Sequence, residues 1–177
     1  EDIFDKAGLA DLNKKESDRS GRLVNGSIVD IWKVRLPFLV ITMIGGLLAG
    51  AVIDAFEEAL EAIAAVAIFI PVIMDMGGNA GTQSSTIFAR GLILGHIDTR
   101  KFLNHLGKET IVGLSMGVLV GVATGIIAST WQGIPELGIA VGIALAITMT
   151  LATTLGFLIP FTLFKLGIDQ AAGADPI

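Results

Sequence analysis

The sequence contains no cysteine and little charge. Without cysteine, these 177 residues can form no disulfide, no thiolate metal site and no cysteine nucleophile. Only 16% of the residues are charged, whereas a typical soluble domain has about a quarter. The net charge of −5 also argues against nucleic acid as a partner, because neutralising phosphates needs a basic face. What remains is apolar: 53% of the residues are hydrophobic, and the mean hydropathy is +0.75.

The charges are unevenly distributed along the chain. Residues 1–35 hold fourteen of the 29 charged residues, and long uncharged runs follow at 36–53, 110–135 and 137–164. A fourth run, 62–89, is interrupted only by Asp75. Runs of about 18 or more apolar residues are typical of membrane-spanning helices, which need about 20 residues to cross the hydrocarbon core. We therefore expect an all-α, polytopic transmembrane helical bundle with about four spans, in contact with the lipid bilayer.

The N-terminal residues differ from the rest in composition. Residues 1–26 are polar and mixed in charge, unlike a signal peptide, and include Gly21 and Gly26 in a stretch that predicts a flexible link. We expect two parts, a cytoplasmic linker at 1–26 and a transmembrane domain at 27–177. Since the chain opens without methionine, we also expect it to be cut from a longer protein.

Basic residues fall on alternate sides of the predicted spans. The link after the first span has four acids and no base, whereas the link before the third contains Arg90, Arg100, Lys101 and Lys108. Because loops rich in Lys and Arg stay in the cytoplasm, this pattern places the N-terminus in the cytoplasm. We expect a multi-pass protein of the plasma membrane.

The chain contains 22 glycines, many of them within the predicted spans. Gly113, Gly117, Gly121 and Gly125 are spaced four apart, and the pairs Gly46/Gly50 and Gly138/Gly142 repeat that spacing. Such faces let helices approach closely in lipid, so we interpret them as packing surfaces. The alternative is that they offer backbone to a permeating solute.

The second run contains the segment PVIMDMGGNAGTQSS at residues 71–85. The 38 residues from 58 to 95 would form a straight helix of about 57 Å, longer than a membrane needs. Pro71 removes a helix hydrogen bond, and glycine pairs are poor helix formers. We therefore predict that the second span is broken at Gly77-Gly78, where irregular backbone would line a wet cavity.

The polar residues of this segment share one helix face. Asp75, Asn79, Thr82, Gln83 and Thr86 are separated by three, four or seven positions. An ionisable group deep in a span usually belongs to an ion path. One carboxylate with amide and hydroxyl oxygens suits Mg²⁺ as the transported ion, because Mg²⁺ keeps much of its water. A different membrane role stays open, in which Asp75 pairs with Arg90 or the amides hold helices together.

Several other groups of residues have a structural explanation that requires no role in function. Asp54, Glu57, Glu58 and Glu61 form an acidic loop that would raise the cation concentration at the outer mouth, although a solvated face is the simpler description of them. His96 and His105 lack the spacing of a helical metal site, and the threonines at 148–154 are expected to bond their own helix. No HExxH or GxSxG motif and no acid–base pair lies within a span, so we do not expect an enzyme.

The segments RLPFLVI, FIPVIMDMGGNAGTQSSTIFARGLILG and GFLIPFTLFKLGID resemble the transmembrane domain of the MgtE family of magnesium channels, over residues 28–177. The resemblance implies a homodimer with a pore at the dimer axis, five spans per protomer and cytoplasmic CBS-type regulatory domains. It also implies that the first residues, EDIFDKAGL, are the end of the helix that connects those domains to the membrane. It implies pore-region roles for Gly77, Gly78, Asn79, Gly81 and Gln83, with backbone carbonyls and polar side chains holding the hydrated ion.

Two expectations go with this resemblance. The role of Asp75 rests on the physical argument alone, because the resemblance does not extend to that residue. The chain also ends just before the family's fifth helix, so we expect a truncated ion-conducting domain. The competing hypothesis is a membrane scaffold or regulatory module that binds partners through its glycine-lined helix faces.

Overall fold

The computed structural model describes residues 14, 17–18, 21–58 and 64–166, and within them the fold is all-α. Its elements are α2 (Ile28–Asp54), the 3₁₀ helix η1 (Ala64–Phe69), α4 (Ile70–Ile93), the 3₁₀ helix η2 (Thr99–Lys101), α5 (Phe102–Gln132) and α6 (Pro135–Lys165). Residues 21–25, expected to be a flexible link, are helical and end at Gly26, whose N–H bonds the carbonyl of Arg22.

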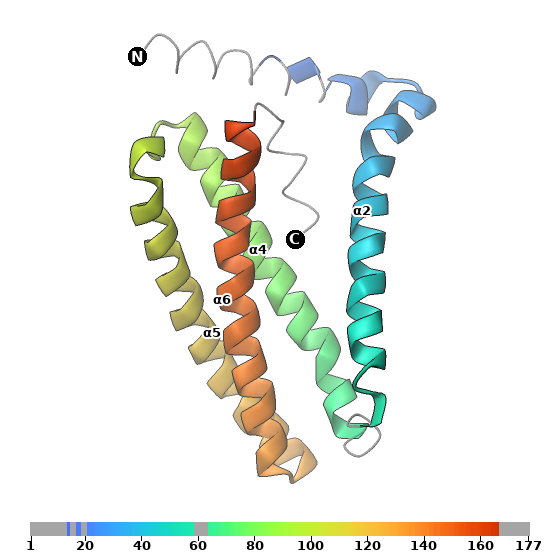
Figure 1. The fold of residues 1–177 in the computed structure, drawn as a ribbon, viewed down its shortest axis with the longest axis vertical. Helices are drawn as coiled ribbons and strands as arrows, with labels where there is room; N and C mark the ends of the chain where they lie inside the picture. The colour runs from blue at the N-terminus through green and yellow to red at the C-terminus, as the bar shows by residue number, and fades with distance from the viewer. Residues whose placement is uncertain (1–13, 15–16, 19–20, 59–63, 167–177) are drawn as a thin grey trace.

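Among the residues that the structure describes, four segments are long and apolar enough to cross a membrane, as the uncharged runs predicted. They are Ile28–Asp54, Ala64–Ile93, Thr99–Gln132 and Pro135–Lys165. The helices run up and down in turn, so the start of α2, the α4–α5 link and the end of α6 share one end of the molecule (Figure 1). The α5–α6 turn and the end of α2 lie at the other end. The basic link and the acidic segment are therefore at opposite ends.

The helices begin and end where local chemistry requires it. The hydroxyl of Ser27 caps α2 by accepting a hydrogen bond from the N–H of Asp30, at 3.3 Å. Gly133 ends α5 in the left-handed region, with φ of 69°, a conformation that costs glycine little. Pro135 then opens α6 at a first-turn position, where its missing N–H costs no helix bond.

Glycines bring α5 and α6 into close contact. A methyl group added to Gly121 would lie 2.5 Å from the carbonyl oxygen of Gly142, and one added to Gly125 would lie 2.6 Å from that of Gly138. Gly117 faces the backbone of Ala146 in the same way. These glycines are buried at a helix interface, which confirms that they serve packing within the chain.

Helices α4, α5 and α6 form a bundle with one apolar cluster toward each end. Phe69, Ala128, Leu137, Val141 and Leu145 form the cluster next to η1. At the end of the α4–α5 link, the other cluster contains Phe88, Leu92, Phe102 and Phe157. There Phe102 stacks on Phe161 with ring centroids 3.5 Å apart, and Phe88 meets Phe157 edge-to-face at 5.1 Å. The bundle thus holds α4 at both ends.

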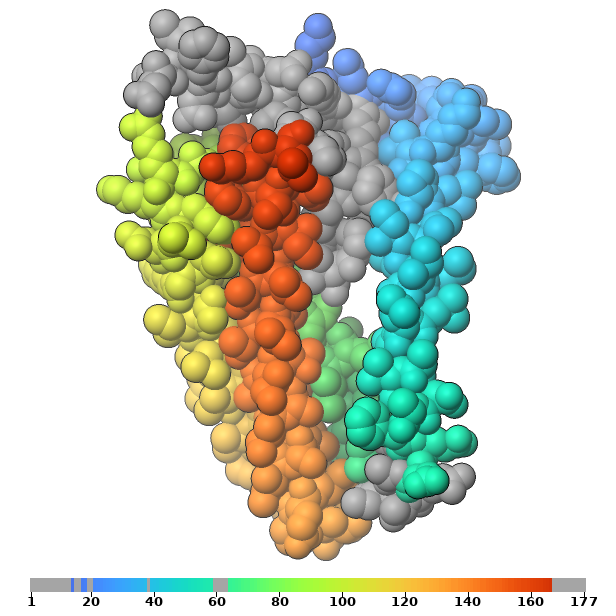
Figure 2. All heavy atoms as spheres, in the orientation of Figure 1, coloured from blue at the N-terminus to red at the C-terminus, as the bar shows by residue number. Residues whose placement is uncertain are grey.

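Helix α2 stands apart from this bundle. An open gap separates it from the other helices along part of its length (Figure 2). None of the most apolar part of α2 is buried. A methyl group added to Gly46 or Gly50 would have nothing within 4 Å. Its small-residue face therefore has no partner among the described residues.

The prediction of a break at Gly77-Gly78 is wrong. Helix α4 continues without interruption from Ile70 to Ile93, and the change of geometry comes earlier, where η1 gives way to α4. Pro71 lies in the first turn, so it removes no internal hydrogen bond. Gly77 faces α6, where an added methyl group would lie 2.7 Å from the side chain of Thr148. The glycine pair thus permits close packing of a continuous helix.

Candidate functional site

One face of α4 carries the predicted polar residues. Asp75, Asn79, Thr82 and Gln83 are exposed, and Thr86 is half-buried. An open groove of about 340 Å³ runs along this face and is lined by Asn79, Thr82, Gln83, Thr86 and Ile87. The spacing argument thus correctly grouped these side chains on one surface. Asp75 lies one turn beyond the lining residues.

The opposite face of α4 is buried and built from small residues. Gly77, Ala80, Gly81, Ser84 and Ser85 are buried there. Gly81 contacts Gly156 of α6 so closely that a methyl group on Gly156 would overlap its backbone. The structure therefore places Gly77 and Gly81 at the α4–α6 interface and not on the polar face. Gly78 is half-buried with open space around it.

Asp75 and Asn79 are joined to each other across one helical turn. The side-chain amide of Asn79 donates a hydrogen bond to Asp75 Oδ2 at 3.1 Å. Pairing of Asp75 with Arg90 is not seen, since fifteen residues of continuous helix separate them by about 22 Å. The bond uses one N–H of the amide, so its carbonyl oxygen and the second carboxylate oxygen remain available to a cation or its water.

The polar groups of this face offer the oxygen ligands that hard cations prefer. The donors are one carboxylate, two amide groups and two hydroxyls, all offering oxygen. Among the residues that the structure describes, no three of His, Cys, Asp and Glu come together as a metal cage. Such a face can bind water molecules of a hydrated ion more readily than it can strip them.

The acidic residues lie at the end of α2. Asp54 closes this helix, and Glu57 and Glu58 follow it, all three exposed. Glu61, predicted with them, lies outside the described residues. The end of α2 is at the end of the molecule opposite the basic α4–α5 link (Figure 1). The three described carboxylates thus lie at the end of the molecule opposite the basic link.

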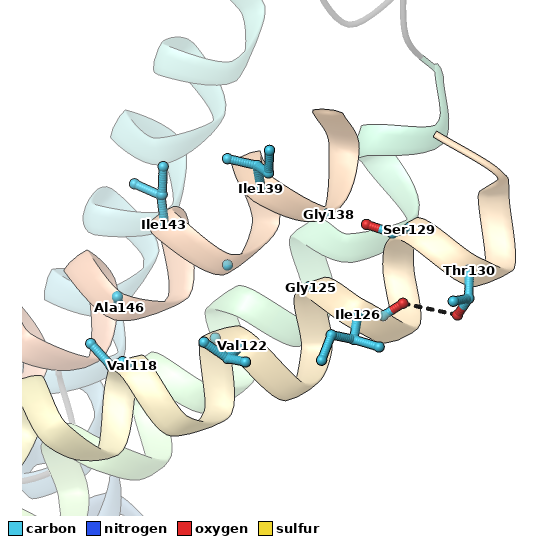
Figure 3. Close-up of a pocket in the computed structure, with 12 residues that line it drawn as sticks. Val118, Val122, Gly125, Ile126, Ser129, Thr130, Gly138, Ile139, Ile143 and Ala146 are labelled. Atoms are coloured by element: carbon cyan, nitrogen blue, oxygen red, sulfur yellow. Dashed lines mark hydrogen bonds between the residues drawn. The ribbon is translucent and has the colours of Figure 1, made fainter. Parts of the chain in front are cut away.

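A second groove, of about 500 Å³, lies between α5 and α6. Valine and isoleucine side chains from both helices line it, and its hydroxyls are near the α5–α6 turn (Figure 3). There the Thr130 hydroxyl bonds the carbonyl of Ile126 at 2.9 Å, within its own helix. The groove has no charged lining residue, so its chemistry does not suit an ion.

The structure adds contacts that sequence reasoning missed. The hydroxyl of buried Ser84 lies 2.8 Å from the carbonyl oxygen of Thr153 and 3.0 Å from Glu109 Oε1. The sequence offers only one indication of these contacts: Ser84 lies three residues after Gly81 and four before Phe88, which places it on the same side of α4 as both. The α6 threonines follow expectation: Thr150, Thr153 and Thr154 each donate to the carbonyl four residues earlier.

Comparison with known proteins gives a consistent family. Residues 70–177 match the MgtE family, described as divalent cation transporter. The chain is 34% identical to the magnesium transporter MgtE of Bacillus subtilis over 143 residues, covering 81% of this chain and 32% of the relative. It is 34% identical to the protein of that name from Thermus thermophilus over 149 residues, covering 84% and 33%. For the Enterococcus faecalis protein the identity is 30% over 172 residues, covering 97% and 36%.

The chain thus spans about a third of the length of these curated relatives. The match begins at the first residue of α4 and includes the whole polar face. With a family match over more than half of its residues, in a bundle of membrane-spanning helices, the chain belongs to the MgtE family of divalent cation transporters.

Proposed function

We propose that this chain is the transmembrane part of a channel or transporter that moves hydrated Mg²⁺ across the membrane along the polar face of α4. The single observation that supports this proposal most is the exposure of that face. In a membrane-spanning helix, exposed polar side chains cannot face lipid without a large cost. They must face water or protein, and α4 already buries its other side, mainly against α6.

The donor set favours a hydrated divalent cation as the substrate. Asp75 supplies one charge, and Asn79, Thr82, Gln83 and Thr86 supply neutral oxygen donors along the groove. Gly78 can add a backbone contact, because it leaves open space beside the helix. Mg²⁺ gives up its water reluctantly, so a path of weak donors lets it bind and leave. Asp54, Glu57 and Glu58 would raise the cation concentration at the outer mouth.

The pore itself requires a second copy of the chain. The polar face points away from the three-helix bundle that carries it, so one chain leaves the path open on one side. Two copies related by a two-fold axis would place two such faces opposite each other. We therefore propose a homodimer with the pore at its axis.

The surroundings follow from the charge pattern. We place the N-terminus and the basic α4–α5 link in the cytoplasm of a cell whose plasma membrane holds the protein. Residues 1–26 then form a cytoplasmic linker, which would join the membrane domain of residues 27–177 to CBS-type regulatory domains in a longer chain. We assign the chain no catalytic activity, since its relatives are named as transporters.

The competing hypothesis is a membrane scaffold that binds partners through glycine-lined faces. The glycines of α5 and α6 are used within the chain, so this hypothesis now depends on Gly46 and Gly50 of the separate helix α2. If the protein were a scaffold, substitutions on the polar face of α4 would leave its binding of partners unchanged.

Mg²⁺ uptake into liposomes containing the full-length protein tests the proposal. Asn79→Ala removes both the amide oxygen and the bond that orients Asp75, and we expect it to reduce uptake by about tenfold or more, as for loss of a contact to a charged group. Asp75→Asn should also reduce uptake, because it removes the only charge of the face.

The matched controls are Asn104→Ala and Glu136→Gln, which change an exposed asparagine of α5 and an exposed acid in the first turn of α6. Both should retain the parent rate. A properly inserted parent that takes up no Mg²⁺ would contradict the transport function. An Asn79→Ala protein as active as the parent would move the ion path away from α4.

A further inference from the structure

Three helices of the bundle meet at one buried serine. Ser84 of α4 has only 1% of its surface exposed, and its hydroxyl lies within hydrogen-bond distance of α5 at Glu109 and of α6 at Thr153. The next residue of α5, Thr110, contacts the hydroxyl of Thr154 in α6 at 3.0 Å. These two polar links of α5 therefore fall at the same level of the bundle, whereas the bond from the Ser129 hydroxyl to the carbonyl of Pro135 lies at the α5–α6 turn.

Glu109 is an unusual residue for this position. Between residues 102 and 165 the only acids are Glu109 and Glu136, and Glu136 lies in the exposed first turn of α6. Glu109 is half-buried, seven residues into α5, and its one recorded polar contact among the described residues is the Ser84 hydroxyl. A carboxyl group facing other helices of a membrane bundle is costly and usually has a function.

The geometry of α4 suggests what this contact controls. At about 100° per residue, Ser84 lies roughly 180° around the helix from Asp75 and roughly 140–160° from Asn79 and Thr82. The contact to Glu109 is thus made on the back of the polar face. The neighbours Ala80 and Gly81 allow close packing but provide no directional side-chain contact. In lipid, such interhelical hydrogen bonds help to fix how helices are placed.

We propose that Glu109 is a positioning residue for α4, which holds the rotation of this helix through Ser84 and so aims the polar face at the water-filled path. Glu109 touches no transported ion in this role. The expected effect of Glu109 on Mg²⁺ uptake rests on the proposed function. The positioning role also predicts how exposed the polar face of α4 is to water, and this can be measured without measuring transport.

The experiment combines two readouts on the full-length protein in membranes. The first is the rate at which a water-soluble maleimide labels a single cysteine introduced by Thr82→Cys, after removal of any cysteines outside these residues. The second is Mg²⁺ uptake by proteins that carry no introduced cysteine. Each is measured for the parent and for Glu109→Ala, Glu109→Gln and Ser84→Ala.

We expect Glu109→Ala and Ser84→Ala to slow both labelling and uptake by roughly two- to tenfold, the range for loss of one hydrogen bond. Glu109→Gln keeps the side-chain length and an oxygen acceptor for the Ser84 hydroxyl, so it should restore both rates. The control Ser115→Ala removes a hydroxyl of α5 that bonds only its own helix, to Val112, and should change neither rate. Ser84→Ala is the milder variant if Glu109→Ala fails to insert.

The outcomes separate the two proposals. If the parent is labelled and active but Glu109→Ala and Ser84→Ala leave labelling unchanged, the positioning role is overturned while the transport function stands. A Glu109→Gln protein as impaired as Glu109→Ala also overturns it. If the parent transports no Mg²⁺ but labelling still depends on Glu109 and Ser84, the positioning role stands and the transport function fails. An unlabelled parent overturns the positioning role and the ion path along α4, whereas the transport function is decided by the uptake rate of the parent.

Discussion

Single glycines decide how closely the helices of this bundle approach. Gly121 shows the effect most simply, because its Cα lies against the backbone of Gly142, which cannot move aside as a side chain could. Sequence spacing identified the glycine face but not which helix it meets. By contrast, Gly107 on the same helix has nothing within 4 Å of an added methyl group.

These two glycines therefore form a matched pair for mutation. Gly121→Ala should lower the free energy of unfolding in detergent by about 1–3 kcal/mol, because the methyl group forces α5 and α6 apart. Gly107→Ala should leave stability unchanged or raise it by up to about 1 kcal/mol through helix propensity. The measurement is the unfolding midpoint on titration with denaturing detergent. Equal effects at both sites would contradict the packing role of Gly121.

At the scale of elements, the helices themselves could be predicted but their contacts could not. The uncharged runs at 36–53, 110–135 and 137–164 correspond closely to α2, α5 and α6, since length and apolarity are direct requirements of crossing a membrane. From the sequence alone, Gly77 is predicted to break the helix, which is why the continuity of α4 was missed. The role of Gly77 is to make room for Thr148 of α6, a contact that cannot be read from the sequence because Thr148 lies far away along the chain. The polar face was predicted from spacing, and the Ser84–Glu109 contact was not, since it depends on how three helices meet.

The aromatic cluster makes a prediction at this scale. Phe88 of α4 is fully buried and meets both Phe157 and Phe161 of α6 edge-to-face. Phe88→Ala should destabilise the protein by roughly 2 kcal/mol or more in the same detergent titration, because the cavity loses contacts that lipid cannot replace. The control is Phe56→Ala. Phe56 lies two residues after the end of α2, and 62% of its surface is exposed. Loss of stability at Phe56 but not at Phe88 would show that α4 is held elsewhere.

At the scale of the whole molecule, charge and topology agree. The alternating course of the four helices places Arg100 and Lys101 at the end where α2 begins, and Asp54, Glu57 and Glu58 at the other end, with the α5–α6 turn (Figure 1). The sequence alone predicted this alternation, because each span reverses the direction of the chain. The two sets of charges lie at opposite ends of the molecule, as the proposed orientation requires.

That orientation gives the last prediction. The described residues contain no cysteine, so single cysteines can report sidedness in intact cells. Glu58→Cys and Gln132→Cys lie at the end proposed to be outside, and both should react with a membrane-impermeant thiol reagent. Thr99→Cys and Asn104→Cys lie at the basic end, and they should react only after the cells are permeabilised, because the Lys- and Arg-rich link stays in the cytoplasm.

The two pairs act as controls for each other: the acidic end is sampled on two different segments, and the basic end at two positions of the segment Thr99–Gln132. The reverse pattern would place the acidic end of α2 in the cytoplasm and remove its proposed role in attracting cations from outside. Opposite results at Glu58 and Gln132 would contradict the up-and-down course of the helices itself. The assay thus tests the proposed direction of the ion path without requiring any transport.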